Sequence, residues 1–114
     1  MKLQGILDQV DDQDLWYLAP EEFENKVTEK STVYRIGLIA YELLTGILPY
    51  QDYPTDTPKK VIGNFEPVPP SDHVKDIPDE IDRVLLRALS ILPDERHETV
   101  LHLRDEFGTL QNSL

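Results

Sequence analysis

The stretch that decides the fold is residues 31–49, which read STVYRIGLIAYELLTGILP. Only Arg35, Glu42 and Thr45 are clearly polar in its interior, where no proline occurs. On a helix of about 3.6 residues per turn, six residues share the face that we expect to be buried: Val33, Ile36, Gly37, Ala40, Leu43 and Leu44. A helix this broadly apolar is buried by neighbours on several sides, and at about 16 residues it is too short to span a bilayer. We therefore predict a central core helix over residues 31–45, with Ser31 as its N-cap.

The excess of acidic residues argues against two classes of partner, nucleic acids and anionic membranes. The 114 residues are enough for one domain and include 22 acidic and 11 basic side chains, for a net charge of −11. Nucleic-acid binding needs clustered Lys and Arg, and an anionic membrane surface also attracts cations, so we expect neither partner. Two explanations of the acidity stay open: one acidic face docks on a basic protein, or dispersed acids are a halophilic adaptation of the whole surface.

The chain has no cysteine and no recognisable signal peptide. The absence of cysteine excludes disulfides, thiolate catalysis and Cys-ligated metals. The first residues, MKLQGILD, lack the long apolar run and cleavage site of a signal peptide. We expect a cytoplasmic protein.

The flanking segments complete a mainly α fold. Helix signals occur in a short helix beginning at Pro20, a second at 58–62, an amphipathic helix at 78–92 and a last helix at 98–107. We expect Gly46 and Gly108 to end the central and the last helix, because glycine adopts the left-handed conformation of a C-cap. The expected organisation is four to five helices around the central one, with an N-terminal arm and acidic loop at 1–14, a helical domain at 15–110 and a tail at 111–114.

Catalytic signals are weak when the residues are considered without a family. His73, His97 and His102 lack metal-ligand spacing, and we expect each to be exposed or capping. No Gly-rich phosphate loop occurs, and the many carboxylates are expected to form solvated surface. Composition and periodicity alone therefore indicate an acidic α-helical domain and nothing more specific.

Three motifs in one order carry a family resemblance. They are Y-x-A-P-E at 17–21, KSTVYRIGLIAYELLTGILPY at 30–50 and LPDER at 92–96. Together they resemble the lower C-terminal lobe of eukaryotic-like Ser/Thr protein kinases, in a truncated, pseudokinase-like form. The resemblance implies that A-P-E closes the activation segment, that the central helix is helix F, and that Glu21 and Arg96 form a structural ion pair.

The sequence also departs from that family. An active kinase needs a Gly-rich loop, a strand Lys paired with a helix Glu, a His-Arg-Asp catalytic loop with its Asn, and a metal-binding Asp-Phe-Gly; none of them occurs here. In the family's S-D-V-x-S-x-G stretch the Asp anchors the catalytic loop, but Thr32 stands at that lost anchor position and Arg35 replaces the second Ser. We expect no catalytic residue, no cofactor or metal, no ATP binding and no enzymatic activity of this chain alone.

Three interpretations of the function stay open. The chain is a non-catalytic module for protein–protein interaction or regulation, or the C-terminal fragment of an active Ser/Thr kinase that transfers phosphate from ATP once the missing parts are supplied, or a folded remnant without a role. Truncation is expected to leave apolar surface on the central helix or on 78–92, so we predict a homodimer or a protein partner. By resemblance to the family's helix-G region, Lys59, Lys60 and Ile62 are possible docking residues.

Overall fold

The computed structural model describes residues 17–50 and 66–113, with side chains described as far as Leu110. This part of the chain contains no strand. Its elements are the α-helices α2 (Glu29–Thr45), α4 (Asp79–Ala88) and α5 (Val100–Ser113) and the short 3₁₀ helices η2 (Pro20–Glu24), η3 (Pro70–Asp72) and η4 (Pro93–Glu95). The predicted mainly α fold is confirmed, although the short helix expected at Pro20 is a 3₁₀ turn and the one expected at 58–62 lies outside the described residues.

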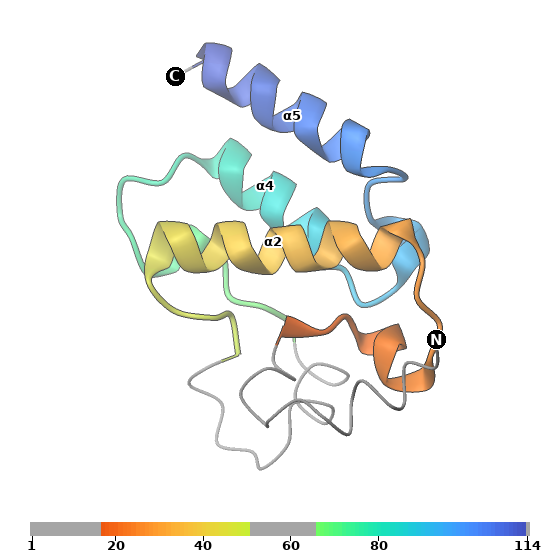
Figure 1. Cartoon of the computed structure of the whole chain (residues 1–114). Coiled ribbons are helices and arrows are strands. Elements are labelled where there is room, and N and C mark those ends of the chain that lie inside the picture. The colour runs from red at the N-terminus through yellow and green to blue at the C-terminus, as the bar shows by residue number, and fades with distance from the viewer. Residues whose placement is uncertain (1–16, 51–65, 114) are drawn as a thin grey trace.

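Helix α2 is the element on which the others are arranged. It runs across the middle of the molecule, α4 crosses behind it, and α5 lies beyond α4 (Figure 1). Both α4 and α5 contact α2 and also contact each other. None of the helices in the described ranges is long and apolar enough to cross a membrane.

Both ends of α2 have a local cause. At the start, Thr28 is the N-cap: its hydroxyl accepts a hydrogen bond from the Lys30 amide at 3.2 Å, while the Thr28 amide donates to Ser31 Oγ at 3.1 Å. This reciprocal pair is a capping box, and it starts the helix two residues before the predicted Ser31. At the other end Gly46 has φ 82°, the left-handed C-cap that the sequence predicted.

The buried face of α2 differs from the predicted one. Of the six residues expected there, Val33 and Gly37 are buried, Ile36 and Ala40 are partly buried, and Leu43 and Leu44 are 81% and 41% exposed. The tyrosine side of the helix is buried instead, through Tyr34, Leu38 and Tyr41. Because the apolar residues cover most of the circumference, periodicity alone could not choose which part of the arc meets neighbours.

Gly37 marks the closest approach of α2 and α4. A Cβ at this position would lie 3.0 Å from Ala88 Cβ and 3.2 Å from Leu89 Cδ2. On one side of this contact Val33 packs with Val84, Ala88 and Leu103 of α4 and α5. The absence of a side chain at residue 37 therefore allows the two helices to meet.

The other two helices differ from the prediction in where they begin and end. Helix α4 buries Val84, Leu85 and Ala88 but stops at Ala88 rather than 92, leaving Leu92 58% exposed. Helix α5 begins at Val100 and continues through Gly108 to Ser113, although Gly108 was expected to end it. A glycine inside a helix costs only about 1 kcal/mol relative to alanine, so a helix with packing on one face can continue through it.

Candidate functional site

The first part of the site is a buried arginine that follows η4. Arg96 has an extended backbone (φ −78°, ψ 171°), and its side chain has no solvent-exposed surface. Its Nη1 donates to Glu21 Oε2 at 2.7 Å and its Nη2 to Glu21 Oε1 at 2.8 Å. This two-pronged geometry is the strongest form of an arginine–carboxylate pair, and it brings together the two residues that the family resemblance paired.

Three backbone carbonyls complete the environment of the Arg96 guanidinium. Its Nε donates to the Ser90 carbonyl at 2.7 Å, its Nη1 to the Lys30 carbonyl at 2.9 Å and its Nη2 to the Ile91 carbonyl at 3.2 Å. With the two bonds to Glu21, each of the five N–H donors of an arginine has an acceptor. The guanidinium also lies 4.8 Å from the centre of the Tyr34 ring, a cation–π distance.

Glu21 is held ionised by the groups around it. Burial alone would raise its pKa, but the hydrogen bonds from Arg96 and from Ser31, whose hydroxyl donates to Oε2 at 2.6 Å, outweigh burial and lower the pKa below its usual value. Ser31 belongs to the first turn of α2. The ion pair therefore joins η2, α2 and the connection between α4 and η4.

A second ion pair lies beside the first and was not predicted. The side chain of Glu22 is fully buried and accepts hydrogen bonds from the Ala19 amide at 2.9 Å, from Arg35 Nε at 2.8 Å and from Arg35 Nη2. The bond to Glu22 raises the pKa of Arg35. Arg35 is the one basic residue of the stretch 31–45, but the sequence does not say which carboxylate pairs with it.

The remaining residues expected at the site are not brought to this cluster. Thr32, at the position where the resembling family has its catalytic-loop anchor, is exposed on α2. The possible docking residues Lys59, Lys60 and Ile62 lie outside the described residues.

Two of the three histidines, His97 and His102, form a separate cluster with Glu106 of α5, whereas His73 is exposed after η3. His97, expected to be exposed or capping, is fully buried, and its Nε2 lies 3.0 Å from Glu106 Oε2. Burial lowers the pKa of His97, while Glu106 opposes that shift. Arg87 Nη1 lies 3.1 Å and His102 Nε2 3.5 Å from Glu106 Oε1. Among the described residues no group of three or more His, Asp or Glu could hold a metal ion.

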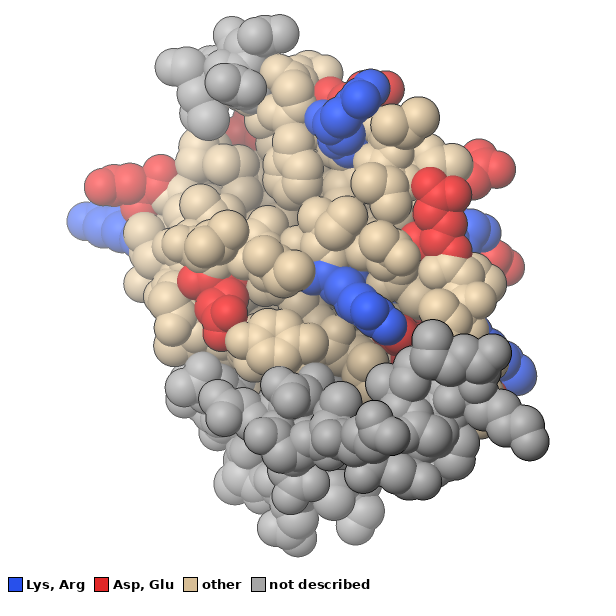
Figure 2. Space-filling view, in the orientation of Figure 1, with Lys and Arg blue, Asp and Glu red and all other residues tan. Residues whose placement is uncertain are grey.

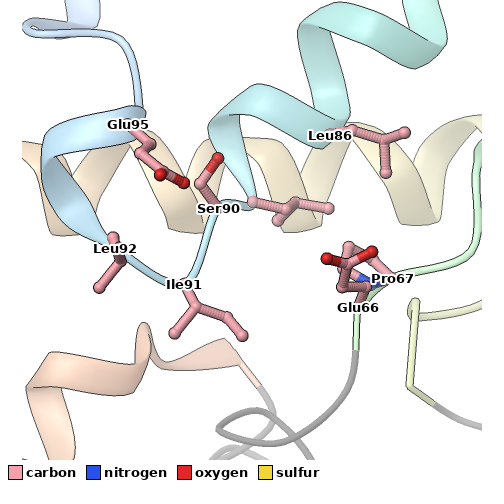
Figure 3. A pocket seen from close by; sticks show the side chains of 8 residues that line it. Glu66, Pro67, Leu86, Ser90, Ile91, Leu92 and Glu95 are labelled. Carbon is pink, nitrogen blue, oxygen red and sulfur yellow. The ribbon is translucent and has the colours of Figure 1, made fainter.

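An open pocket of about 470 Å³ lies at the end of α4. Its lining residues are Glu66, Pro67, Leu86, Leu89, Ser90, Ile91, Leu92 and Glu95. Glu66 and Glu95 lie on opposite sides of it (Figure 3). Both of these charged lining residues are acidic.

Comparison with known proteins connects this geometry to one class of enzyme. The chain is 37% identical over 92 residues to the serine/threonine-protein kinase PknB of Mycolicibacterium smegmatis, a match that covers 77% of this chain and 14% of that protein. It is 31% identical over 99 residues to a probable serine/threonine-protein kinase of Clostridium acetobutylicum (85% and 15%) and 32% identical over 90 residues to the serine/threonine-protein kinase Pkn1 of Myxococcus xanthus (78% and 13%). The chain thus spans about one seventh of the length of these relatives. No protein-family model matches it.

Proposed function

The chain is homologous to one segment of the eukaryotic-like Ser/Thr protein kinases, and from this premise we propose that it is a non-catalytic, kinase-like C-lobe module that acts by binding other proteins. One observation carries the proposal. The ion pair of Glu21 and Arg96 is complete and buried, while Thr32, at the position that tethers the catalytic loop in the resembling family, is a neutral exposed residue. The chain thus keeps the ion pair that stabilises the fold but lacks the residue that anchors the catalytic loop in that family.

The energetics of the ion pair support a module that is stable without a catalytic segment. Taking a guanidinium and a carboxylate out of water costs several kcal/mol per ion, and the cost is offset only when the geometry is good and the remaining hydrogen bonds are made. All five donors of Arg96 are used, and Glu21 also accepts from Ser31. The described residues therefore satisfy this centre without any further catalytic segment.

Phosphoryl transfer requires groups that the sequence of this chain lacks. The reaction depends on positioning ATP and on stabilising charge, with a phosphate-covering loop, Mg²⁺ ligands and a catalytic Asp. The sequence contains no Gly-rich loop, no His-Arg-Asp and no Asp-Phe-Gly. The sequence therefore lacks the family's metal-binding Asp and the Asp that accepts the proton of a substrate hydroxyl.

A thermal-shift titration with Mg-ATP tests the proposal, with an active bacterial Ser/Thr kinase domain as the positive control. A ligand at 100 times its Kd stabilises a protein by about 2.7 kcal/mol, so binding would raise the melting temperature visibly. We expect no rise with Mg-ATP and no transfer of labelled phosphate to a general Ser/Thr substrate. A rise that depends on the ATP concentration, or any transfer above background, contradicts the proposal.

A second candidate function is favoured by the same ion pair. Glu21 and Arg96 match the pair that the resembling family uses, as expected if the chain is part of an active kinase that transfers phosphate once the other parts are present. The size of the protein in its own cells separates the two. A product near 13.1 kDa, the mass of this chain, supports the module, whereas a longer product with His-Arg-Asp and Asp-Phe-Gly supports the kinase.

A further inference from the structure

A fully buried histidine lies in the connection between η4 and α5. His97 Nε2 is 3.0 Å from Glu106 Oε2, and His97 Nδ1 is buried without a hydrogen-bond partner among the described residues. Burial alone would raise the pKa of Glu106, but the hydrogen bond with His97 and the nearby cations lower it, so this carboxylate is ionised and only accepts hydrogen bonds. In the neutral ring the proton therefore lies on Nε2, and Nδ1 is a bare nitrogen shielded from solvent.

The charged and titratable groups that face His97 come from α4 and α5. They are Arg87 of α4 and His102 and Glu106 of α5. The rings of His97 and His102 meet edge to face with 5.2 Å between their centres. Glu106 Oε1 is 3.1 Å from Arg87 Nη1 and 3.5 Å from His102 Nε2. The single negative charge among these groups is thus shared with a permanent cation.

A second proton on the His97 ring would have to occupy Nδ1. It would create a charged, buried donor without an acceptor, an arrangement that costs free energy in a protein interior. Burial accordingly lowers the pKa of His97, although Glu106 opposes this shift. The protonated ring is therefore favoured only in a state in which Nδ1 is exposed to water.

Helix α5 is the element whose movement would expose Nδ1. Two of the three groups that face His97 belong to α5, and the helix lies at the edge of the molecule, beyond α4 (Figure 1). Among the α5 side chains that the structure describes, only Leu103 is fully buried. On the side shown in Figure 2 the surface between α2 and α5 is largely uncharged, so apolar packing rather than surface ion pairs holds α5 there.

The rest of the described chain has a core of its own without α5. One buried cluster includes no residue of α5 and consists of Ala19, Tyr34, Leu38, Tyr41, Tyr50 and Leu89. The hydrogen-bonded pair of Glu21 and Arg96 also lies outside α5. Elements with few buried contacts open at a lower free energy than the core does, so α5 can separate before the whole domain unfolds.

We propose that His97 is a pH-sensitive switch, whose protonation opens α5 away from α4 and α2 while these two helices and the pair of Glu21 and Arg96 stay folded. The opening uncovers apolar side chains that pack with Leu103 of α5, among them Val33 of α2 and Val84 of α4. Acid therefore exposes an apolar surface that is covered at neutral pH. The switch needs only the fold and does not depend on the proposed function.

The linkage between protonation and opening gives the size of the effect. An open state with a solvated His97 binds a proton with the ordinary pKa of about 6.5, whereas the closed state binds it only at a lower pH. The open population should therefore grow severalfold, and at most about 30-fold, between about pH 7.5 and 5. Solvated Glu106 titrates near about 4.3, so it adds little within this range.

Amide hydrogen exchange, followed by mass spectrometry at these two pH values and corrected for the intrinsic effect of pH on exchange, tests the switch. We expect α5 amides to be less protected than α2 amides at both pH values, because α5 opens without global unfolding. The exchange of α5 should rise severalfold at the lower pH in the wild type and in the control His73→Gln, whose histidine is exposed outside the cluster. His97→Gln should abolish the rise, because glutamine does not titrate.

Three results would overturn the proposal. Equal protection of α5 and α2 amides at the lower pH would show that the helices open as one cooperative unit. Exchange of α5 that does not change between the two pH values, or a rise that persists in His97→Gln, would show that His97 does not control the opening. If His97→Gln does not fold, the wild-type comparisons of α5 with α2 and of the two pH values still decide.

Discussion

At Arg96 a single side chain joins segments that lie 75 positions apart in the chain. Its guanidinium holds Glu21 on one side and the carbonyls of Ser90 and Ile91 on the other. Removing one partner of such a pair leaves an uncompensated buried charge, which costs more than the pair itself contributes. The loss of Arg96 should therefore be felt throughout the domain.

We predict that Arg96→Ala lowers the free energy of unfolding by about 3–5 kcal/mol, measured by urea denaturation. Arg104→Ala is the control, because the Arg104 side chain is 70% exposed and, among the residues that the structure describes, pairs only with the adjacent Asp105. An exposed pair of this kind contributes about 0–1 kcal/mol. If Arg96→Ala does not fold, Arg96→Lys, which keeps the charge but not the fork of donors, should still lose more than Arg104→Ala. Equal effects would show that the buried pair does not stabilise the fold.

His97 predicts a dependence of stability on pH. Burial lowers its pKa in the folded protein, with Glu106 and His102 of α5 and Arg87 of α4 around it. The unfolded state thus binds the proton more readily, so the contribution of His97 is complete above the unfolded pKa of about 6.5 and is lost as the pH falls through the lower folded value. We expect the melting temperature to fall between about pH 7.5 and 5, and His97→Gln to flatten that fall.

His73→Gln is the control for this measurement, since His73 is exposed and lies outside the cluster of His97 and Glu106. The pKa values of Glu21 and Glu106 are lowered, so these carboxylates titrate below the chosen window. The same slope in the wild type and in His97→Gln would rule out His97 as the titrating group.

At the scale of single residues, the sequence predicted a contact between residues of two known motifs. It did not predict contacts that arise only when the helices pack. The pairing of Glu21 with Arg96 came from two motifs of one family, not from their separation. Glu22 and Arg35 belong to no such motif pair, so their contact could not be foreseen. His97 looked exposed because the carboxylate that makes its burial tolerable, Glu106, reaches it only through the packing of α5.

At the scale of elements, helix ends were predictable where a backbone conformation demands a residue type. Gly46 ends α2 because its φ of 82° strains any other residue. Gly108 does not adopt a left-handed backbone conformation, and α5 continues through it. The buried face of α2 was not predictable, since a helix that is apolar on two sides has no single preferred direction.

The same two helices provide a matched pair of glycine substitutions. We predict that Gly37→Ala destabilises the protein, because its Cβ would meet Ala88 Cβ at 3.0 Å and overpacking costs about 1–3 kcal/mol, against a gain in helix propensity of about 1 kcal/mol. Gly108→Ala should instead stabilise by about 0.5–1 kcal/mol, since nothing lies within 4 Å of its Cβ. Thermal melts of both variants should shift in opposite directions. A rise with Gly37→Ala would mean that α2 and α4 separate at little cost.

At the scale of the whole molecule, the fold class followed from apolar periodicity, while the meaning of the charge did not. Among the described helices, α2 contacts both α4 and α5. The broad apolar arc of the α2 sequence predicted neighbours on more than one side. Net charge influences solubility and association rather than fold. The 22 acidic and 11 basic residues therefore have to be interpreted by experiment.

We predict that the melting temperature rises as sodium chloride is raised from low to molar concentration. Half of the acidic residues have no basic counterpart by number, and at about 0.01 M salt the Debye length of about 30 Å lets their repulsion act across the domain, whereas at about 1 M it is about 3 Å. Salt also weakens surface pairs such as Glu80 with Arg83, but exposed pairs contribute little. Unfolding at low salt would identify the acidity as a halophilic adaptation, a moderate rise would indicate simple self-repulsion, and a flat or falling melting temperature would contradict both.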